Sequence, residues 1–228
     1  MIDCIIPLLT KSFLPVKDSQ SVFPVRRVYC IGRNYAEHAR EMGHDPDREP
    51  PFFFQKNVDN IATNGSFKYP VKSEDVHHEI EMVVALKSGG KSIPVALATQ
   101  HIFGYGIGFD MTRRDLQQNA KNLGRPWEIG KAFEQSAPCG NLVPIEVTGI
   151  IDKGKISLKI NNIIKQCADI SQMIWSVPEM ISILSDYFEL AAGDVIMSGT
   201  PAGVDSVQIG DVMLGFIEGL GELKIVVD

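Results

Sequence analysis

Three acidic residues in two separate segments have the clearest chemical potential in this sequence. In "HHEIEMVVAL", residues 77–86, Glu79 and Glu81 are two positions apart, so their carboxylates share one face of an extended strand. Asp110 ends a second strand-like run, "YGIGFD". Carboxylates held together repel one another, and a divalent cation relieves this repulsion at neutral pH. Hard oxygen ligands without clustered cysteines favour Mg²⁺ or Mn²⁺ over zinc, with Ca²⁺ as a further candidate.

A different interpretation of the Glu-x-Glu pair is the solvated face of an edge strand, where charge discourages aggregation. Groups that bind anions follow the acids and favour a binding site instead: Arg113, Arg114, Gln117, Lys131 and the turn "SGTPAGV", residues 198–204. Glycines at 104, 106 and 108 leave one side of the Asp110 strand bare, which lets another group approach its backbone. Together these features predict a site that chelates a small carboxylate substrate on a metal ion.

A histidine and a glutamate in "NYAEHAREMG", residues 34–43, form a candidate acid–base pair. His38 and Glu41 are three positions apart, so on a helical turn they share a face and can hydrogen-bond. On a surface helix such a contact is often incidental. The polar, Pro-rich loop that follows, "MGHDPDREPP", is typical of a lid over a site and favours a catalytic role for the pair.

The strands that position these residues are short, and turn residues separate them. Strands are predicted in "RRVYCIG", "IEMVVAL", "IFGYGIGFD", "GKISLKI", "DVIMSGT" and "DVMLGFIEGLGELKIVV". Helices are predicted within residues 34–43, 95–100, 111–124 and 176–190, where Ser176 can cap the last helix. Regular β-α alternation and a Gly-rich fingerprint are both missing, which disfavours a doubly wound nucleotide-binding fold. The predicted fold class is therefore α+β and mainly β, with sheets that fold around each other and a few helices outside.

Composition predicts one compact domain. The chain has 228 residues, 44% of them hydrophobic and 22% charged, without a linker, repeat or low-complexity tract. The formal net charge is −6 and basic residues are dispersed, so nucleic acid is not an expected partner. The apolar start "MIDCIIPLL" is short for a membrane span and lacks a basic leader, so we expect an early strand and no membrane association. The four cysteines form no CxxC pair, which favours reduced thiols in a cytoplasmic protein.

Six ordered blocks of this sequence resemble the fumarylacetoacetate hydrolase family. They are "GRNYAEHAREMG", "HHEIEMVVAL", "GFDMTRRDLQ", "GRPWEIGKAFEQSAPCG", "MIWSVPEMISILS" and "AGDVIMSGTPAGV". Within the family the chain is most similar to the small fumarylpyruvate and acylpyruvate hydrolases. The resemblance implies a mixed β-sandwich roll with peripheral helices, usually a homodimer. It also implies a single catalytic domain over residues 24–228, preceded by an N-terminal extension or strand at residues 1–23.

The implied activity is hydrolysis of a C–C bond in a 2,4-diketo acid such as fumarylpyruvate, which gives pyruvate and a second acid, fumarate. The substrate would be a small dicarboxylic keto acid, and the protein would serve aromatic catabolism in the gentisate pathway. Two alternatives stay open, namely oxaloacetate decarboxylation or tautomerisation at the same metal site, and a non-catalytic binding module. The presence of both His38 and Glu41 disfavours the binding module.

Roles for single residues carry over where the blocks align. The resemblance implies one Mg²⁺ or Mn²⁺ per subunit on Glu79, Glu81 and Asp110. It implies that His38, oriented by Glu41, takes a proton from water, and that Lys131 with Gln117 steadies the oxyanion. Substrate contacts are expected from Arg33, Arg114, Gly199 and Thr200.

A few neighbouring residues carry further expectations. His77 and His78 precede the acids, and one of their rings is expected to hydrogen-bond to a ligand carboxylate. Arg113 is a second candidate, beside Arg33, for the distal carboxylate of the substrate, with a plain surface role as the alternative. Trp127 is expected to pack in the interior, as is "PFFFQK", residues 51–56, of which the final lysine can face the pocket.

Overall fold

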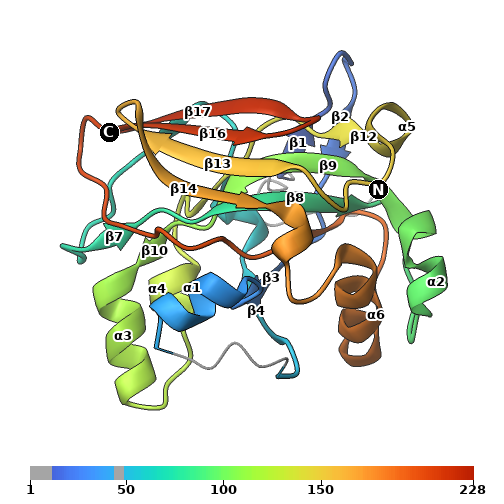
Figure 1. The fold of residues 1–228 in the computed structure, drawn as a ribbon, viewed down its shortest axis with the longest axis horizontal. Helices are drawn as coiled ribbons and strands as arrows, with labels where there is room; N and C mark the ends of the chain where they lie inside the picture. Colours follow the sequence, from blue (N-terminus) through green and yellow to red (C-terminus); the bar gives the residue numbers. More distant parts are fainter. Residues whose placement is uncertain (1–11, 44–48) are drawn as a thin grey trace, which may run out of the picture.

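The structure, a computed structural model, describes residues 12–43 and 49–228. The strand predicted at the apolar start and part of the predicted lid loop lie outside these residues. The described chain forms two main sheets and a few helices, as the sequence predicts (Figure 1).

The larger sheet has six strands, in the order β12-β9-β8-β15-β3-β4. Neighbours are antiparallel, except that β15 runs parallel to β3. The strands are β3 (Arg27–Gly32), β4 (Phe52–Lys56), β8 (Ile80–Leu86), β9 (Ile102–Phe109), β12 (Val143–Pro144) and β15 (Asp194–Met197). Five of these six elements fall within segments that the sequence marks as strands or as the packed "PFFFQK" run. The strands β8 and β9 therefore lie in the interior of the sheet, where they can position side chains on both faces.

The smaller sheet has five strands, in the order β14-β13-β16-β17-β6, and its only parallel pair is β17 with β6. The strands are β6 (Ser66–Phe67), β13 (Lys155–Ile160), β14 (Ile163–Asp169), β16 (Val212–Ile217) and β17 (Gly221–Val227). This sheet lies across one face of the six-stranded sheet (Figure 1). Gly215 permits the close approach, because a Cβ there would meet Ile80 and Phe109 at 2.9 Å.

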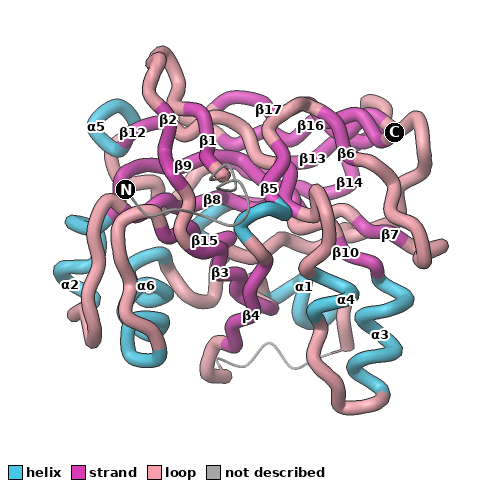
Figure 2. The backbone as a smooth tube through the Cα atoms, turned by 180° about the vertical axis from the view of Figure 1, so that it is seen from behind, coloured by secondary structure: helices cyan, strands magenta, loops and turns pink. Residues whose placement is uncertain are grey.

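Three two-stranded pairs complete the described strands (Figure 2). They are β1 (Phe13–Pro15) with β2 (Val22–Pro24), β5 (Ile61–Ala62) with β11 (Ala137–Pro138), and β7 (Val76–His77) with β10 (Thr112–Arg113). The β1–β2 hairpin packs on the core through Leu14 and Phe23, which are both buried. Residues 12–23, the described part of the predicted N-terminal extension, are thus built into the fold.

The helices form two groups below the six-stranded sheet (Figure 1). On one side lie α1 (Ala36–Glu41), α3 (Arg114–Asn122) and α4 (Glu128–Lys131), and on the other lie α2 (Val95–Ala98) and α6 (Val177–Tyr187). A short α5 (Ile145–Thr148) and the 3-10 turns Val58–Asn60, Thr99–His101 and Ile170–Gln172 lie in connections. The predicted cap of α6 is present, since Glu179 accepts the Ser176 backbone N–H over 2.9 Å. No helix in the described part of the chain is long and apolar enough to cross a membrane.

Strand β8 is buried on both faces, and this decides between the two interpretations of the Glu-x-Glu pair. Met82 and Val84 lie in the core cluster between the two sheets, whereas Val83 and Ala85 lie in a second cluster on the opposite face. The interpretation of this segment as an edge strand with a solvent-exposed face is therefore wrong, because β9 and β15 pair with β8 on either side.

The glycines of β9 admit another part of the chain, as predicted. A Cβ on Gly104 would strike the backbone of Val143, and one on Gly106 would lie 3.3 Å from the carbonyl oxygen of Asn141. The group that approaches this bare side is thus the protein's own segment that leads into β12. It closes the second core cluster beside the acids.

Candidate metal centre and catalytic pocket

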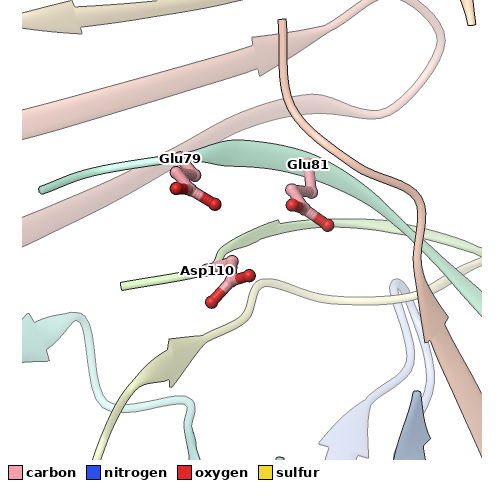
Figure 3. Close-up of side chains that lie close together, drawn as sticks. All are labelled: Glu79, Glu81 and Asp110. Atoms are coloured by element: carbon pink, nitrogen blue, oxygen red, sulfur yellow. The ribbon is translucent and has the colours of Figure 1, made fainter. Parts of the chain in front are cut away.

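The pairing of β8 with β9 brings the three predicted acids together. Glu81 lies on β8, Glu79 directly precedes that strand, and Asp110 directly follows β9. The antiparallel register pairs Ile80 with Phe109, and the Asp110 N–H donates to the Glu79 carbonyl over 2.8 Å. One carboxylate oxygen of each acid lies within 4.8 Å of those of the other two. The three side chains point into one shared space (Figure 3), and all three are buried.

Two of the three carboxylates already have cationic partners from the chain. Glu79 accepts from Arg114 at 2.5 Å and from Lys131 at 2.8 Å. Asp110 has Lys131 Nζ 2.8 Å from one oxygen and Lys56 Nζ 2.8 Å from the other. Lys56 also donates to the carbonyls of Met111 and Lys131, so the lysine that ends "PFFFQK" does face the site.

Glu81 is the acid without a cation among the described residues. Its Oε2 accepts the backbone N–H of Gly199 over 2.9 Å. Burial, and then the charges of Asp110 and Glu79, raise the pKa of Glu81 well above its usual range. Burial would also raise the pKa of Glu79, but Lys131 and Arg114 outweigh it and hold that pKa below its usual range. A buried, uncompensated carboxylate among hard oxygen donors is the environment that a divalent cation stabilises.

These acids fit Mg²⁺ or Mn²⁺ by donor chemistry. All three are carboxylates, they come from rigid strand ends, and no cysteine among the described residues joins their cluster. Glu79, Glu81 and Asp110 would hold such an ion.

A pocket opens over the acids and collects most of the predicted site residues. Besides the three acids it is lined by Arg33, His38, Arg114, Gln117, Lys131 and Thr200. Two predicted residues do not line the pocket but contact residues that do. Glu41 contacts His38, and the Gly199 N–H donates to Glu81. Arg113 does not line this pocket; its guanidinium lies 4.3 Å from the centre of the Phe133 ring, so the structure favours Arg33 over Arg113 as a pocket group.

The His38–Glu41 pair forms as predicted on α1. The ring Nδ1 lies 3.1 Å from Glu41 Oε2, and the same carboxylate accepts the Gly203 N–H at 3.0 and 3.2 Å from its two oxygens. Burial would raise the pKa of Glu41, but the hydrogen bonds from His38 and Gly203 lower it, which keeps the carboxylate ionised. Because Glu41 occupies Nδ1, Nε2 is the ring nitrogen left for proton transfer in the pocket.

The two histidines before the acids do not hydrogen-bond to a ligand carboxylate in the described chain, so that expectation is wrong. His77 Nε2 lies 2.9 Å from Asp75, and His78 Nδ1 lies 3.1 Å from Gln166 Oε1. Burial lowers the pKa of His78 to about 4, so this ring is neutral at physiological pH. For His78 the reason is strand alternation, because it lies on the face opposite Glu79 and is directed toward β14. His77 is instead held by its contact with Asp75.

Gln166 is a functional candidate that no sequence pattern indicated. It is fully buried on β14, in the other main sheet. Its Oε1 accepts the Ile80 N–H over 3.1 Å, and its Nε2 donates to Thr200 Oγ1 over 2.8 Å and to the Pro201 carbonyl over 2.7 Å. No local motif announces this contact, because it joins segments 34 residues apart in the chain.

Trp127 and Lys121 also line the pocket, and neither was predicted as a site residue. Trp127 packs on aromatic rings as expected, but one side of it faces the pocket. The spacing of Lys121 could have indicated its place in the pocket. It lies seven positions after Arg114 and four after Gln117, so all three share one face of α3.

Comparison with protein-family models matches residues 27–228 to the fumarylacetoacetate (FAA) hydrolase C-terminal family. A fumarylpyruvate hydrolase from Ralstonia sp. is 38% identical over 189 residues, which are 82% of this chain and 98% of that protein. A mitochondrial oxaloacetate tautomerase FAHD1 from Arabidopsis thaliana is 33% identical over 202 residues, which are 89% of this chain and 91% of that protein.

A crystal structure of fumarylpyruvate hydrolase from Pseudomonas aeruginosa in complex with Mn²⁺ and pyruvate has the same fold. It is 48% identical, with a TM-score of 0.97, and the match covers 99% of each chain.

Proposed function

The chain belongs to the fumarylacetoacetate hydrolase family, and from this membership we propose that it is a metal-dependent hydrolase of 2,4-diketo acids, with fumarylpyruvate as substrate. Water would cleave the bond between C3 and C4 to give pyruvate and fumarate. The observation that carries the proposal is that three buried carboxylates and the His38–Glu41 pair converge on one pocket. The relative that holds Mn²⁺ and pyruvate supports both the metal and the product.

Mg²⁺ or Mn²⁺ is the proposed cofactor, held by Glu79, Glu81 and Asp110. When bound, the dication supplies the positive charge that draws electrons from the 2-oxo group and stabilises an enolate. It would also supply the counter-charge that Glu81 lacks in the part of the chain that the structure describes.

His38 is the proposed general base. Its Nε2 takes a proton from water while Glu41 holds Nδ1, and the hydroxide adds to the C4 carbonyl carbon. Collapse of the tetrahedral intermediate breaks the C3–C4 bond and leaves the electron pair on C3. The proton then passes to C3, which completes pyruvate, and the C4 carbon departs as the carboxyl group of fumarate.

Lys131 and Gln117 are the proposed donors to the oxyanion that forms on C4. Gln117 Oε1 accepts from Arg114 over 2.7 Å, so its amide nitrogen remains available as a donor. Arg114 and the Thr200 hydroxyl are the proposed contacts for the carboxylate next to the 2-oxo group. The Gly199 N–H, which is bonded to Glu81, instead orients a metal ligand.

Product analysis tests this proposal against its nearest rival. The rival is oxaloacetate tautomerisation or decarboxylation, which relatives at 33% identity support. The purified protein with Mn²⁺ is incubated separately with fumarylpyruvate and oxaloacetate, and pyruvate, fumarate, CO₂ and the keto–enol absorbance are followed. We expect stoichiometric pyruvate and fumarate from fumarylpyruvate. Tautomer exchange or CO₂ release from oxaloacetate without fumarylpyruvate cleavage contradicts the hydrolase assignment.

We further propose a homodimer, as the family resemblance implies, with residues 24–228 as the catalytic domain. We propose a cytoplasmic location because the four cysteines form no CxxC pair. Light scattering coupled to gel filtration tests the dimer, because a monomeric mass at micromolar concentration contradicts it. A truncation that begins at residue 24 tests the domain boundary. That variant removes the β1–β2 hairpin with its buried Leu14, so a fold that persists without the hairpin is the supporting result.

A further inference from the structure

Two cations of the pocket have no carboxylate partner within ion-pair distance among residues 12–43 and 49–228. They are Arg33, which directly follows β3, and Lys121, which lies on the last turn of α3. Arg114, Lys131 and Lys56, in contrast, are all paired with the acids of the metal centre. Both side chains are half-buried. Because even partial burial of an unpaired charge is unfavourable, two such cations in one pocket indicate a place for an anion.

Aromatic rings hold both cations in place without neutralising them. The Arg33 guanidinium lies 5.4 Å from the centre of the Phe52 ring, and Lys121 Nζ lies 5.1 Å from that of Trp127. The two rings meet edge to face at 5.1 Å. The cations are therefore positioned by one connected pair of rings.

The same rings lead back to the metal centre. Trp127 lies 5.9 Å from Phe54, and Lys131, which contacts two of the acids, has its Nζ 5.1 Å from the Phe54 ring. The Phe52 and Phe54 rings are themselves 6.4 Å apart, so with Trp127 they form one aromatic row. It lies between the acids and the two cations that have no carboxylate partner among the described residues. This row offers an apolar wall to a carbon chain that has one anionic group at each end.

The electrostatics agree with an excess of positive charge at this end. Burial, and then the neighbouring charges of Arg114 and Arg33, lower the pKa of Lys121 to about 8. An anion bound between Arg33 and Lys121 would reverse this shift.

We propose that Arg33 and Lys121 form a subsite for the second carboxylate of the substrate and select dicarboxylic over monocarboxylic 2,4-diketo acids. This inference rests on the hydrolase function proposed above and names its substrate class. The first carboxylate lies at the metal centre, the carbon chain lies along the aromatic row, and the second carboxylate accepts from the guanidinium and the ammonium group.

The kinetic test compares fumarylpyruvate with acetylpyruvate, which lacks the second carboxylate. In Lys121→Met, kcat/KM for fumarylpyruvate should fall about 10- to 100-fold more than that for acetylpyruvate, the usual effect of losing a charge-assisted bond. Lys121→Arg should restore most of the preference. Lys91→Met, which removes an exposed lysine paired with Glu189 at 3.8 Å, is the matched control. Equal losses on both substrates, or no loss on either, would overturn the subsite.

A binding test separates this inference from the hydrolase proposal. The metal-loaded proteins are titrated calorimetrically with 2-oxoheptanedioate and with 2-oxoheptanoate, which differ only in the second carboxylate. Both lack the 4-oxo group that water attacks, so they are not hydrolysed. The parent should bind the diacid at least about tenfold more tightly, and Arg33→Met and Lys121→Met should each reduce that ratio. A parent that does not prefer the diacid contradicts the subsite whether or not it hydrolyses fumarylpyruvate. If the parent prefers the diacid but hydrolyses no 2,4-diketo acid, the subsite is supported and the proposed reaction is contradicted.

Discussion

The side-chain amide of Gln166 donates to the Thr200 hydroxyl oxygen over 2.8 Å and thereby fixes where that hydroxyl can send its own proton. The orientation of the amide follows from its other partners. The Ile80 N–H can only donate and the Pro201 carbonyl can only accept, so Oε1 and Nε2 cannot exchange places. Thr200 is therefore an acceptor on the Gln166 side, and its hydrogen remains available to a carboxylate in the pocket.

Replacing Gln166 with glutamate tests this relation. The carboxylate can still accept from Ile80, but it takes the Thr200 proton instead of donating to the hydroxyl. We expect KM for fumarylpyruvate to rise about tenfold with little change in kcat, which corresponds to the loss of about one hydrogen bond to the substrate. In a Thr200→Val background the same change should raise KM no further, although the lost bond to the Pro201 carbonyl lowers stability in both backgrounds. Gln20→Glu, at an exposed turn position, is the control. Additive effects in the two backgrounds would show that Gln166 does not act through Thr200.

Glu81→Gln separates the catalytic and the stability effects of the metal site. Removing a ligand should reduce kcat/KM by about 10²- to 10⁴-fold, since the metal contributes several kcal/mol to the transition state. The metal-free variant should melt no lower than the metal-free parent, because glutamine replaces a carboxyl group whose anionic form is disfavoured by burial. Initial-rate assays measure the loss of kcat/KM. Scanning fluorimetry with and without Mn²⁺ measures the melting temperature, and the rise in Tm with Mn²⁺ should disappear. Glu74→Gln, at an exposed position, should retain that rise. A Glu81→Gln protein that Mn²⁺ still stabilises fully would contradict the ligand assignment.

If the His38–Glu41 pair acts as the general base, its loss should reduce kcat without weakening the binding of a substrate analogue. His38→Gln should lower kcat about 10²- to 10⁴-fold, the usual contribution of a general base. Glu41→Gln should lower it less, because His38 keeps its place on α1 and loses the carboxylate that orients it. The affinity for oxalate, an analogue of the pyruvate enolate, should change little in either variant. Glu37→Gln, an exposed acid on the same helix, is the control. Unchanged turnover in His38→Gln would remove the general-base role.

The substrate preference should depend on pH through Lys121. The pKa of this lysine is lowered to about 8, so its charge is complete below that pH and lost above it. Lys131 and the metal ligand Glu79 also influence it, besides Arg114 and Arg33. The ratio of kcat/KM for fumarylpyruvate to that for acetylpyruvate should therefore fall between pH 7 and about 9, because kcat/KM reports the free enzyme. In Lys121→Arg the ratio should stay constant over this range. A parallel decline in that variant would assign the titration to another group.

The close approach to β9 predicts a position-specific loss of stability. Gly104→Ala should lower the free energy of unfolding by about 1–3 kcal/mol, because the new methyl group strikes the Val143 backbone, which cannot move away easily. Gly140→Ala should have a smaller effect, because its methyl group would meet Leu223 at an ordinary contact distance of 3.4 Å. Urea unfolding of both variants measures the difference. Equal stability of the two variants would contradict the packing of this segment against β9.

The sequence was sufficient to predict most strands of the two main sheets, the helices α1, α2, α3 and α6, and the three acids that cluster in the pocket. Local patterns carry this information, since alternation places Glu79 and Glu81 on one face of β8, and helical spacing places His38 beside Glu41. The same patterns placed His78 wrongly. A strand pattern gives the face of a side chain but does not identify what covers that face, and here the cover is Gln166 on the other sheet.

What the sequence determined by itself is the chemistry available: hard oxygen ligands, an oriented histidine, and cations for a carboxylate substrate. Which of these groups meet depends on tertiary packing. Among the described residues, packing places no cation against Glu81, pairs Lys56 with Asp110, and brings Arg33 and Lys121 onto a shared aromatic wall. The physical reason is that periodicity fixes directions within one strand or helix, whereas distances between elements depend on how the sheets and helices pack. The charges and hydrogen bonds of the pocket follow from those distances.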